Sequence, residues 1–470
     1  MTDFGFLSAV QIAANYREET LTPTVLVDAL CERVATLDPT LHAMISFDVE
    51  NVRHQAMACE RELAAGLDRG PLHGIPVAIK DIIDVEGMAT TCASAVFRDH
   101  VAGRNASVVS RLVEAGAIIF GKTNTHEFAC GGPSPDLPVP PAANPWNPGH
   151  HPGGSSSGSG SGVAAGLFPL ALGTDTGGSV RHPASACGVV GLKPTYGLVS
   201  RHGVFPLAQS LDCVGGLART VRDSGLLLNA LVGQDPADPS SVSCPWRDCT
   251  NDMGKGLEGV RIGYVRHFHT EDLDAPAETV AALDGAANRL RSAGAVVEEA
   301  RLPSLESFFS VNRVLLSAEG FSIHGSMLRE QPENYGALAR RALLAGAFLS
   351  AEDYLAAQKL RKGLMEQMER VFEQYDVFLL ASSMEPASRL DEPQETRRTY
   401  TRQARTPFSV TGHPALAMMA GLSKERLPLS LQFAAGKFQE AMLLRVAEAY
   451  ETLTELPVHP PQFSQPTQTG

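Results

Sequence analysis

Two glycine- and serine-rich stretches near the middle of the chain contain the residue types that acyl-transfer chemistry requires. Residues 153–162 read GGSSSGSGSG, and residues 173–179 read GTDTGGS. Glycine permits backbone conformations closed to other residues and lets successive N–H groups converge on one point. Acyl transfer needs this convergence, because negative charge develops on the carbonyl oxygen of the tetrahedral intermediate. The second stretch therefore predicts an oxyanion hole formed by the backbone amides of Thr176, Gly177 and Gly178.

Ser179 lies at the edge of this predicted hole and is the candidate nucleophile. A serine nucleophile needs a base. Three histidines lie close by in the sequence: His150, His151 and His182. A Ser–His–Asp arrangement is therefore one interpretation, and residues 154–158 fit the G-x-S-x-G pattern. That pattern should follow a strand directly, whereas the proline-rich segment 145–152 precedes it here.

A buried lysine is the other available base. Lys80 closes an apolar run at residues 75–79, where a lysine rarely serves solubility. Desolvation lowers the pKa of a lysine, so a neutral amine at this position can accept a proton. The alternative is a strand-end lysine paired with Asp81 or Asp84, and the sequence leaves both interpretations open.

Two of these short motifs also have non-catalytic interpretations. Residues 153–162 have the composition of a flexible linker, but an apolar helix is expected immediately afterwards at 163–167. Residues 116–123, GAIIFGKT, match the phosphate-loop pattern G-x-x-x-x-G-K-[ST]. A phosphate loop would place the four middle residues in a turn, whereas Ala-Ile-Ile-Phe predicts a strand. We therefore expect no nucleotide site and no cofactor.

The elements that must position these residues follow from apolar periodicity. Short apolar runs flanked by glycine predict strands at 75–79 and 117–120, with a helix at 107–114 between them. This β–α–β order favours a sheet covered by helices. Further strands are expected at 259–265 and 376–380, and further helices at 22–37, 276–293 and 350–375. The Pro- and Gln-rich tail after Pro457 is expected to be frayed.

Composition and charge narrow the class of protein. The 470 residues are 44% hydrophobic and only 19% charged, with 43 Gly and 31 Pro, which suits a compact enzyme with many tight turns. No segment resembles a linker between independent units, so one domain is expected. The net charge of −13 and the lack of clustered Lys and Arg argue against direct nucleic-acid binding.

Neither a secretion signal nor a membrane span is predicted. The first sixteen residues lack a basic start followed by an apolar run, and the smooth apolar stretch at 163–172 is too short to cross a bilayer. A cytoplasmic protein is therefore expected, in which the eight scattered cysteines remain free thiols. Cys244 and Cys249 lack a histidine pair at zinc-ligand spacing, so no metal is expected.

In combination, the motifs resemble those of the amidase-signature family. The matching segments are long, in order and correctly spaced, and they cover about a third of the chain strongly. They are HGIPVAIKD (73–81), GKTN (121–124), NPWN (144–147), PGGSSSGS (152–159), GTDTGGSVR (173–181), CGVVGLKPTYG (187–197) and PLAQSLD (206–212). A weaker match continues at TGHPA (411–415).

The resemblance implies a Ser–cisSer–Lys triad. In this scheme Ser179 is the nucleophile, Ser155 the bridging serine after a cis peptide bond, and Lys80 the base. Asp175 and Arg181 occupy positions where a carboxylate and a guanidinium brace the nucleophile loop.

The resemblance also implies a fold. We expect one large α/β domain, residues 1–470, whose central mixed β-sheet is covered by helices on both faces. Its expected parts are N-terminal helices (1–70), the catalytic core (71–225), a helical substrate-pocket region (226–375) and the C-terminal part of the sheet with its helices (376–470).

Three departures from the family pattern bear on specificity and none touches the triad. Leu198 stands where the family often has Arg, Gly216 ends a motif that usually ends in Pro, and Ser409 replaces a frequent Asn. Pocket walls are expected from residues 130–141 and 308–348. The apolar side chains of the second segment could instead be core: Phe308, Phe309, Leu315, Phe321 and Leu344.

Two functions are expected from this resemblance. The main expectation is a stand-alone serine hydrolase that cleaves the C–N bond of small amides, anilides or carbamates (urethanes) through an acyl-enzyme. Its partners would be a small-molecule substrate and, as an open alternative, a second copy in a homodimer, without nucleic acid or membrane. The alternative function is the A subunit of a tRNA-dependent amidotransferase, which would release ammonia from glutamine for a partner subunit.

Overall fold

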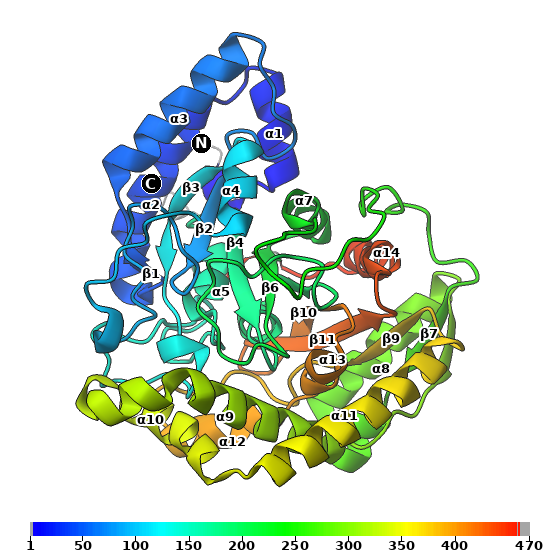
Figure 1. The fold of residues 1–470 in the computed structure, drawn as a ribbon. Coiled ribbons are helices and arrows are strands. Elements are labelled where there is room, and N and C mark those ends of the chain that lie inside the picture. The colour runs from blue at the N-terminus through cyan, green and yellow to red at the C-terminus, as the bar shows by residue number, and fades with distance from the viewer. Residues whose placement is uncertain (1–2, 458, 461–470) are drawn as a thin grey trace.

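The protein is built on one mixed β-sheet in the middle of the molecule (Figure 1). A computed structural model describes residues 3–457 and 459–460. The strands are β1 (Met44–Ser46), β2 (Pro76–Lys80), β3 (Ile118–Thr123), β4 (Leu170–Asp175), β5 (Val190–Lys193), β6 (Cys213–Ala218), β7 (Arg261–Tyr264), β8 (Val296–Glu299), β9 (Val377–Ala381), β10 (Ala415–Leu422) and β11 (Pro428–Ala435).

Their order across the sheet is β1-β3-β2-β4-β6-β5-β10-β11-β9-β7-β8. Strands β3, β2 and β4 are parallel on one side, and β9, β7 and β8 are parallel on the other. Antiparallel pairings through β6, β5, β10 and β11 join these two parallel groups.

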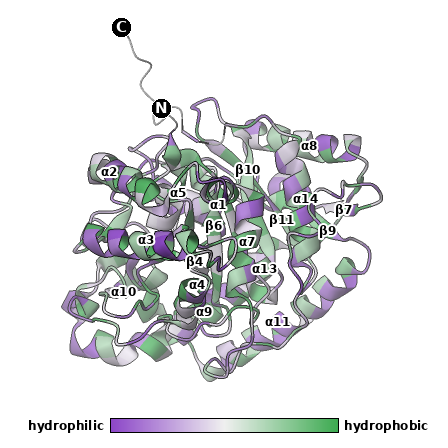
Figure 2. Cartoon of the chain, turned by 90° about the horizontal axis from the view of Figure 1, so that it is seen from above, coloured by the Kyte–Doolittle hydropathy of each residue, from purple (hydrophilic) through white to green (hydrophobic). Residues whose placement is uncertain are grey.

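Helices account for most of the remaining structure. They are α1 (Ala9–Arg17), α2 (Pro23–Leu41), α3 (Val49–Ala64), α4 (Ser107–Glu114), α5 (Ser157–Ala164), α6 (Arg181–Cys187), α7 (Val221–Leu231), α8 (Ala277–Ser292), α9 (Leu305–Glu330), α10 (Ala337–Leu344), α11 (Ala351–Phe372), α12 (Pro393–Thr401), α13 (Thr406–Thr411) and α14 (Glu440–Thr452). Helices α9, α10 and α11 pack together along one edge of the molecule (Figure 1). Seen from above, α3 and α11 carry many hydrophilic residues (Figure 2).

Helices cover both faces of the sheet. A side chain at Gly215 in β6 would contact Val180, whereas one at the next residue, Gly216, would contact Leu227 of α7. Because successive strand residues point to opposite faces, α7 and the segment after β4 lie on opposite sides of the sheet. The helices α4, α7, α14 and α8 form a series in which each contacts the next, and α5 packs against α6. The expected single α/β domain is confirmed.

Most of the predicted elements are present. The predicted strands at 75–79, 117–120, 259–265 and 376–380 correspond to β2, β3, β7 and β9, and the predicted helices at 22–37, 107–114, 276–293 and 350–375 correspond to α2, α4, α8 and α11. Strand β3 extends through Thr123, so the segment that matches a phosphate-loop pattern is extended and buried. The predicted frayed tail lies outside the described residues, apart from 459–460.

The linker interpretation of residues 153–162 is wrong. Helix α5 begins at Ser157, inside this stretch, and all of its residues are buried. A helix expected only from residue 163 therefore starts too late. A Cβ at Gly158 would lie 2.1 Å from the Ala43 carbonyl oxygen, and one at Gly162 would lie 2.1 Å from the Phe168 ring. The glycines serve close packing, which composition alone does not distinguish from flexibility.

Two searches of the described residues bear on the expected environment and ligands. No helix in the described part of the chain is long and apolar enough to cross a membrane. In those same residues, no group of three or more His, Cys, Asp and Glu side chains is placed to hold a metal ion.

Candidate active site

Lys80 is the last residue of the buried strand β2, and its side chain points to the start of α5. Its Nζ lies 2.7 Å from Ser155 Oγ and 2.8 Å from Thr174 Oγ1. Lys80 is fully buried, and its expected alternative partner Asp81 is paired with Lys122 at 2.9 Å instead. The interpretation of Lys80 as a strand-end lysine in an ion pair is therefore wrong.

The surroundings of Lys80 favour its neutral form. Burial lowers the pKa of Lys80 to about 7, although the negative charges of Asp212 and Asp175 partly oppose this shift. A lysine with this pKa is substantially deprotonated near neutral pH. The amine can then accept a proton from a neighbouring hydroxyl, which an ordinary lysine cannot do at that pH.

The segments that carry Ser155 and Ser179 are joined to each other. The peptide bond between Gly154 and Ser155 is cis, and Ser155 is 2% exposed. The next residue, Ser156, donates its backbone N–H to the carbonyl oxygen of Ser179 at 3.2 Å. Ser179 itself is only partly buried. The structure thus brings Lys80, Ser155 and Ser179 together, with the most accessible hydroxyl on Ser179.

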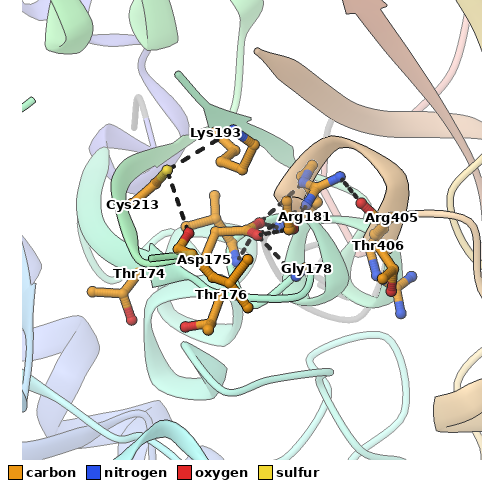
Figure 3. A network of polar contacts seen from close by, with 12 residues as sticks. Thr174, Asp175, Thr176, Gly178, Arg181, Lys193, Cys213, Arg405 and Thr406 are labelled. Atoms are coloured by element: carbon orange, nitrogen blue, oxygen red, sulfur yellow. Dashed lines mark hydrogen bonds and ion pairs between the residues drawn. The ribbon is translucent and has the colours of Figure 1, made fainter. Parts of the chain in front are cut away.

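Asp175 anchors the loop that leads to Ser179 (Figure 3). Its carboxylate accepts hydrogen bonds from Arg181 Nε at 3.0 Å, Arg181 Nη2 at 2.9 Å and the Gly178 backbone N–H at 2.8 Å. Burial by itself would raise the pKa of Asp175, but the charge and hydrogen bonds of Arg181 outweigh it and lower the pKa to about 2. The ionised carboxylate therefore holds the turn between β4 and α6 in place.

The backbone amides of this loop are used unequally. The Gly178 N–H already donates to Asp175, whereas no acceptor is found among the described residues for the N–H groups of Thr176 and Gly177. Thr176 is fixed by its hydroxyl, which donates to Asp212 at 2.6 Å. Two of the three amides predicted for an oxyanion hole are therefore free to receive a ligand oxygen.

The nearby histidines do not supply a base. His151 Nδ1 lies 3.0 Å from the backbone nitrogen of Gly153, and His182 Nδ1 lies 3.3 Å from that of Gly154. In the described residues no histidine is hydrogen-bonded to the hydroxyl of Ser155 or Ser179. Burial also lowers the pKa of His151 to about 3. The Ser–His–Asp interpretation is wrong, because these imidazoles receive backbone amides.

A cavity of about 590 Å³ lies beside the site and reaches it at Thr174 and Thr176. Its other walls come mainly from residues 196–214 and 237–240. Apolar side chains there include Val204, Phe205 and Leu207, and charged ones are Arg201, Asp212 and Asp238. None of the lining residues comes from 130–141 or 308–348, and Phe308 and Leu315 are fully buried core.

Sequence reasoning missed two residues of the site. Thr174 holds the second hydrogen bond of Lys80, and Asp212 fixes Thr176. Both belong to segments already recognised by motif, GTDTGGSVR and PLAQSLD. The motif positions were therefore a usable signal, but the contacts themselves depend on how β4 and the segment before β6 pack.

Comparison with known proteins shows extensive similarity. A curated relative from Carboxydothermus hydrogenoformans, described as the A subunit of glutamyl-tRNA(Gln) amidotransferase, is 35% identical and covers 96% of this chain and 98% of its own. The crystal structure of the protein of that description from Thermotoga maritima has a TM-score of 0.82, 31% identity and 98% coverage of both chains. The peptide amidase from Stenotrophomonas maltophilia has a TM-score of 0.86 and 30% identity, covering 98% of this chain and 99% of that one.

These comparisons correct two expectations. The main expectation of a stand-alone hydrolase of small amides, anilides or carbamates is wrong, because curated relatives 34–37% identical over nearly their full length are described as amidotransferase A subunits. The expected partners, a small molecule and a second copy without nucleic acid, are wrong for the same reason. The relatives are described as subunits of an enzyme named for a tRNA.

The family itself follows from the longest match. A family model described as amidase matches residues 25–444, which include every element of the sheet. The matched region also contains Lys80, Ser155, Ser179 and the loop anchored by Asp175. The chain belongs to the amidase family, in agreement with the amidase-signature resemblance of its motifs.

Proposed function

We propose that the protein hydrolyses the carboxamide of glutamine through an acyl-enzyme on Ser179, as the A subunit of a tRNA-dependent amidotransferase. The observation that carries the chemistry is the 2.7 Å contact between buried Lys80 and Ser155, on a segment bonded to that of Ser179. The description shared by the full-length curated relatives supports glutamine as the ammonia source. The released ammonia would serve a partner subunit that acts on a glutamyl group carried by tRNA.

The proton path begins at the neutral amine of Lys80. Lys80 accepts the proton of the Ser155 hydroxyl while Thr174 Oγ1, at 2.8 Å, holds one of the amine hydrogens. Ser155 in turn takes the proton of Ser179, whose oxygen forms a bond to the carboxamide carbon. Because Lys80 gains the positive charge and the substrate oxygen the negative charge, no net charge is created inside the site.

The negative oxygen is received by backbone amides. Thr176 and Gly177 have N–H groups for which the described residues offer no other acceptor, and the Asp212 bond to the Thr176 hydroxyl fixes their direction. Preorganised donors of this kind are worth about 3–4 kcal/mol each in other acyl-transfer enzymes. Gly178 contributes by holding the loop to Asp175 and donates no bond to the substrate.

Breakdown of the intermediate returns the proton. The C–N bond breaks as Ser155 donates its proton to the departing nitrogen and regains one from the Lys80 ammonium, so ammonia leaves and a glutamyl ester remains on Ser179. Water then attacks the ester by the same path and releases glutamate, which restores Ser179.

The test measures ammonia release from glutamine by the purified protein, alone and with the remaining amidotransferase subunits. We expect ammonia release in the assembled enzyme, with formation of γ-glutamyl hydroxamate when hydroxylamine intercepts the acyl-enzyme. Ser179→Ala should lower the rate at least about 10³-fold, because it removes the attacking oxygen. Ser292→Ala, at an exposed position at the end of α8, is the matched control and should retain full activity.

Two results would contradict the proposal. Ammonia release that persists in Ser179→Ala would remove Ser179 from its role. Absence of release from glutamine in the assembled enzyme, with turnover of another carboxamide, would keep the acyl-enzyme chemistry and reject glutamine.

A further inference from the structure

A cluster of aromatic and cationic side chains lies behind the two serine segments and has no part in the proton path. Its members are His126, His151, His182, Tyr400 and Arg405. His126, His151, His182 and Arg405 are each at most 7% exposed, and Tyr400 is partly buried. These residues come from four separate parts of the chain, and all of them approach the loops that end at Ser155 and Ser179.

The two glycines before Ser155 leave room for this cluster. A Cβ at Gly154 would lie 2.1 Å from His126 Cε1, so the imidazole rests directly on the peptide preceding Ser155. A Cβ at Gly153 would lie 2.7 Å from the carbonyl oxygen of His182. The backbone N–H of His126 also donates to the carbonyl oxygen of Ser155 at 3.0 Å. The position of Ser155 is thus defined by contacts on several sides.

His182 joins the two serine segments directly. It belongs to α6, which begins just after Ser179, and its Nδ1 accepts the backbone N–H of Gly154 at 3.3 Å. The bond links a residue close to Ser179 with the residue next to Ser155. It adds to the bond from the Ser156 N–H to the Ser179 carbonyl oxygen, so two links at separate points define how the segments lie.

The link requires a neutral imidazole, because a protonated one has no acceptor nitrogen. Burial and the neighbouring charge of Arg405 hold the pKa of His182 well below its usual range. His151, 3.0 Å from the Gly153 nitrogen, is also 3.2 Å from the Ser388 nitrogen, and a neutral ring can accept only one of these. His182 Nδ1 is committed to Gly154 alone among the described residues and is the more specific anchor.

Tyr400 on α12 keeps the imidazoles in place. Its ring centroid lies 4.4 Å from that of His182 and 5.0 Å from that of His151, both edge to face. Aromatic pairs in this geometry add about 0.5–1.5 kcal/mol beyond their buried area. Arg405 follows α12, and its Nε lies 2.7 Å from where a Cβ of Gly178 would be. The segment 400–405 thus contacts both serine loops.

We propose that His182, held by Tyr400, is a positioning residue that sets Ser155 against Ser179. The proposal rests on the roles given to these serines in the proposed function. It predicts that the acceptor atom at position 182 matters for reaction rate more than for folding. A merely structural role predicts that loss of activity follows loss of stability.

The experiment compares His182→Gln, whose side-chain oxygen can accept the Gly154 N–H, with His182→Leu, which fills similar volume without an acceptor. The main readout is the rate at which a fluorophosphonate labels Ser179, because this needs an activated serine and no glutamine. Glutamine kcat and KM and the thermal unfolding midpoint are measured in parallel. His54→Leu, at an exposed position of α3, is the matched control.

We expect His182→Leu to lower the labelling rate and kcat by about 10–100-fold, since displacing a reacting group by about 1 Å costs up to 10²-fold. KM should change by less than about threefold, and His182→Gln should recover most of the rate. Equal rates in the Gln and Leu variants would overturn the proposal, as would a loss that scales with the unfolding midpoint across all variants.

A second pair keeps the test decisive if His182→Leu does not fold. Tyr400→Phe retains the ring and should label at nearly the normal rate, whereas Tyr400→Leu should be slowed about 10-fold or more. Unchanged labelling in Tyr400→Leu would reject its supporting role. Labelling of Ser179 in a protein that does not use glutamine would reject only the substrate proposal. Absence of labelling in the unmodified protein would reject the serine assignments and this inference together.

Discussion

At the scale of single residues, burial determines what the charged side chains of the site can do. Lys80 and Asp175 are both fully buried, yet burial gives them opposite states. Lys80 has no carboxylate within ion-pair distance among the described residues, and its pKa falls to about 7. Asp175 has Arg181 beside it and remains ionised. One is thereby available as a base and the other as a fixed anchor.

The pH dependence of activity should report the state of Lys80. Below its pKa the ammonium cannot accept a proton, so kcat/KM should fall as pH drops through about 7 and level off above it. Because the negative charge of Asp212 raises the pKa of Lys80, Asp212→Asn should move this acid limb to lower pH. A profile of kcat/KM from about pH 5 to 9 for both proteins tests this. A limb that stays in place or moves to higher pH in Asp212→Asn would contradict the assignment.

At the scale of elements, α5 shows how glycine allows tight packing around a reacting group. The helix starts two residues after Ser155 and lies fully buried between neighbouring segments. Backbone atoms of Ala43 and Asn124 approach Gly158 so closely that any Cβ would overlap them. The small residues of this helix therefore bring Ser155 up to Lys80 at the end of β2.

Adding a methyl group to α5 should be costly. Gly158→Ala would place its Cβ 2.1 Å from the Ala43 carbonyl oxygen, and we expect it to lower the free energy of unfolding by about 3 kcal/mol or more. Gly363→Ala, on α11, meets nothing within 4 Å and should raise it by about 0.5–1 kcal/mol through helix propensity. Urea unfolding of both variants measures the difference. A stable Gly158→Ala protein would mean that α5 has room that the structure does not show.

At the scale of the whole molecule, buried carboxylates join parts that are distant in sequence. Asp223 on α7 accepts the backbone N–H groups of Ala9 and Val10 at 3.0 and 3.1 Å, and so caps the N-terminal helix α1. Glu440 at the start of α14 accepts the N–H of Thr195 at 2.8 Å, close to the end of β5. These contacts attach peripheral helices to the sheet that carries the site.

Removing the cap on α1 should weaken the molecule without changing the chemistry. Asp223→Ala leaves two helix N–H groups without their acceptor, and we expect it to lower the free energy of unfolding by about 1–3 kcal/mol. Asp28→Ala removes an exposed carboxylate paired with Arg53 and should cost at most about 1 kcal/mol. Thermal unfolding and the rate of proteolysis near the N-terminus measure the effect. Equal stability of the two variants would show that the α1 cap contributes little.

The sequence by itself determined the family, the type of fold and the residues proposed for catalysis. Lys80, Ser155, Ser179 and Asp175 stand in motifs whose order and spacing are visible in the chain, and short apolar runs predicted β2 and β3. The substrate could not be predicted in the same way. The same serines and lysine serve any acyl C–N bond, and the comparisons overturned the stand-alone hydrolase that had been expected from the motifs.

Only the tertiary structure decided which contacts these residues make. Residues 75 positions apart meet at the Lys80–Ser155 contact, and 251 positions separate Arg181 from the Gln432 it contacts. The position of α5, the occupied amide of Gly178 and the link from His182 to Gly154 likewise depend on how distant segments pack. Burial and hydrogen bonding are properties of that packing. They set the pKa of Lys80 and the use of each backbone amide, which residue type and spacing leave undetermined.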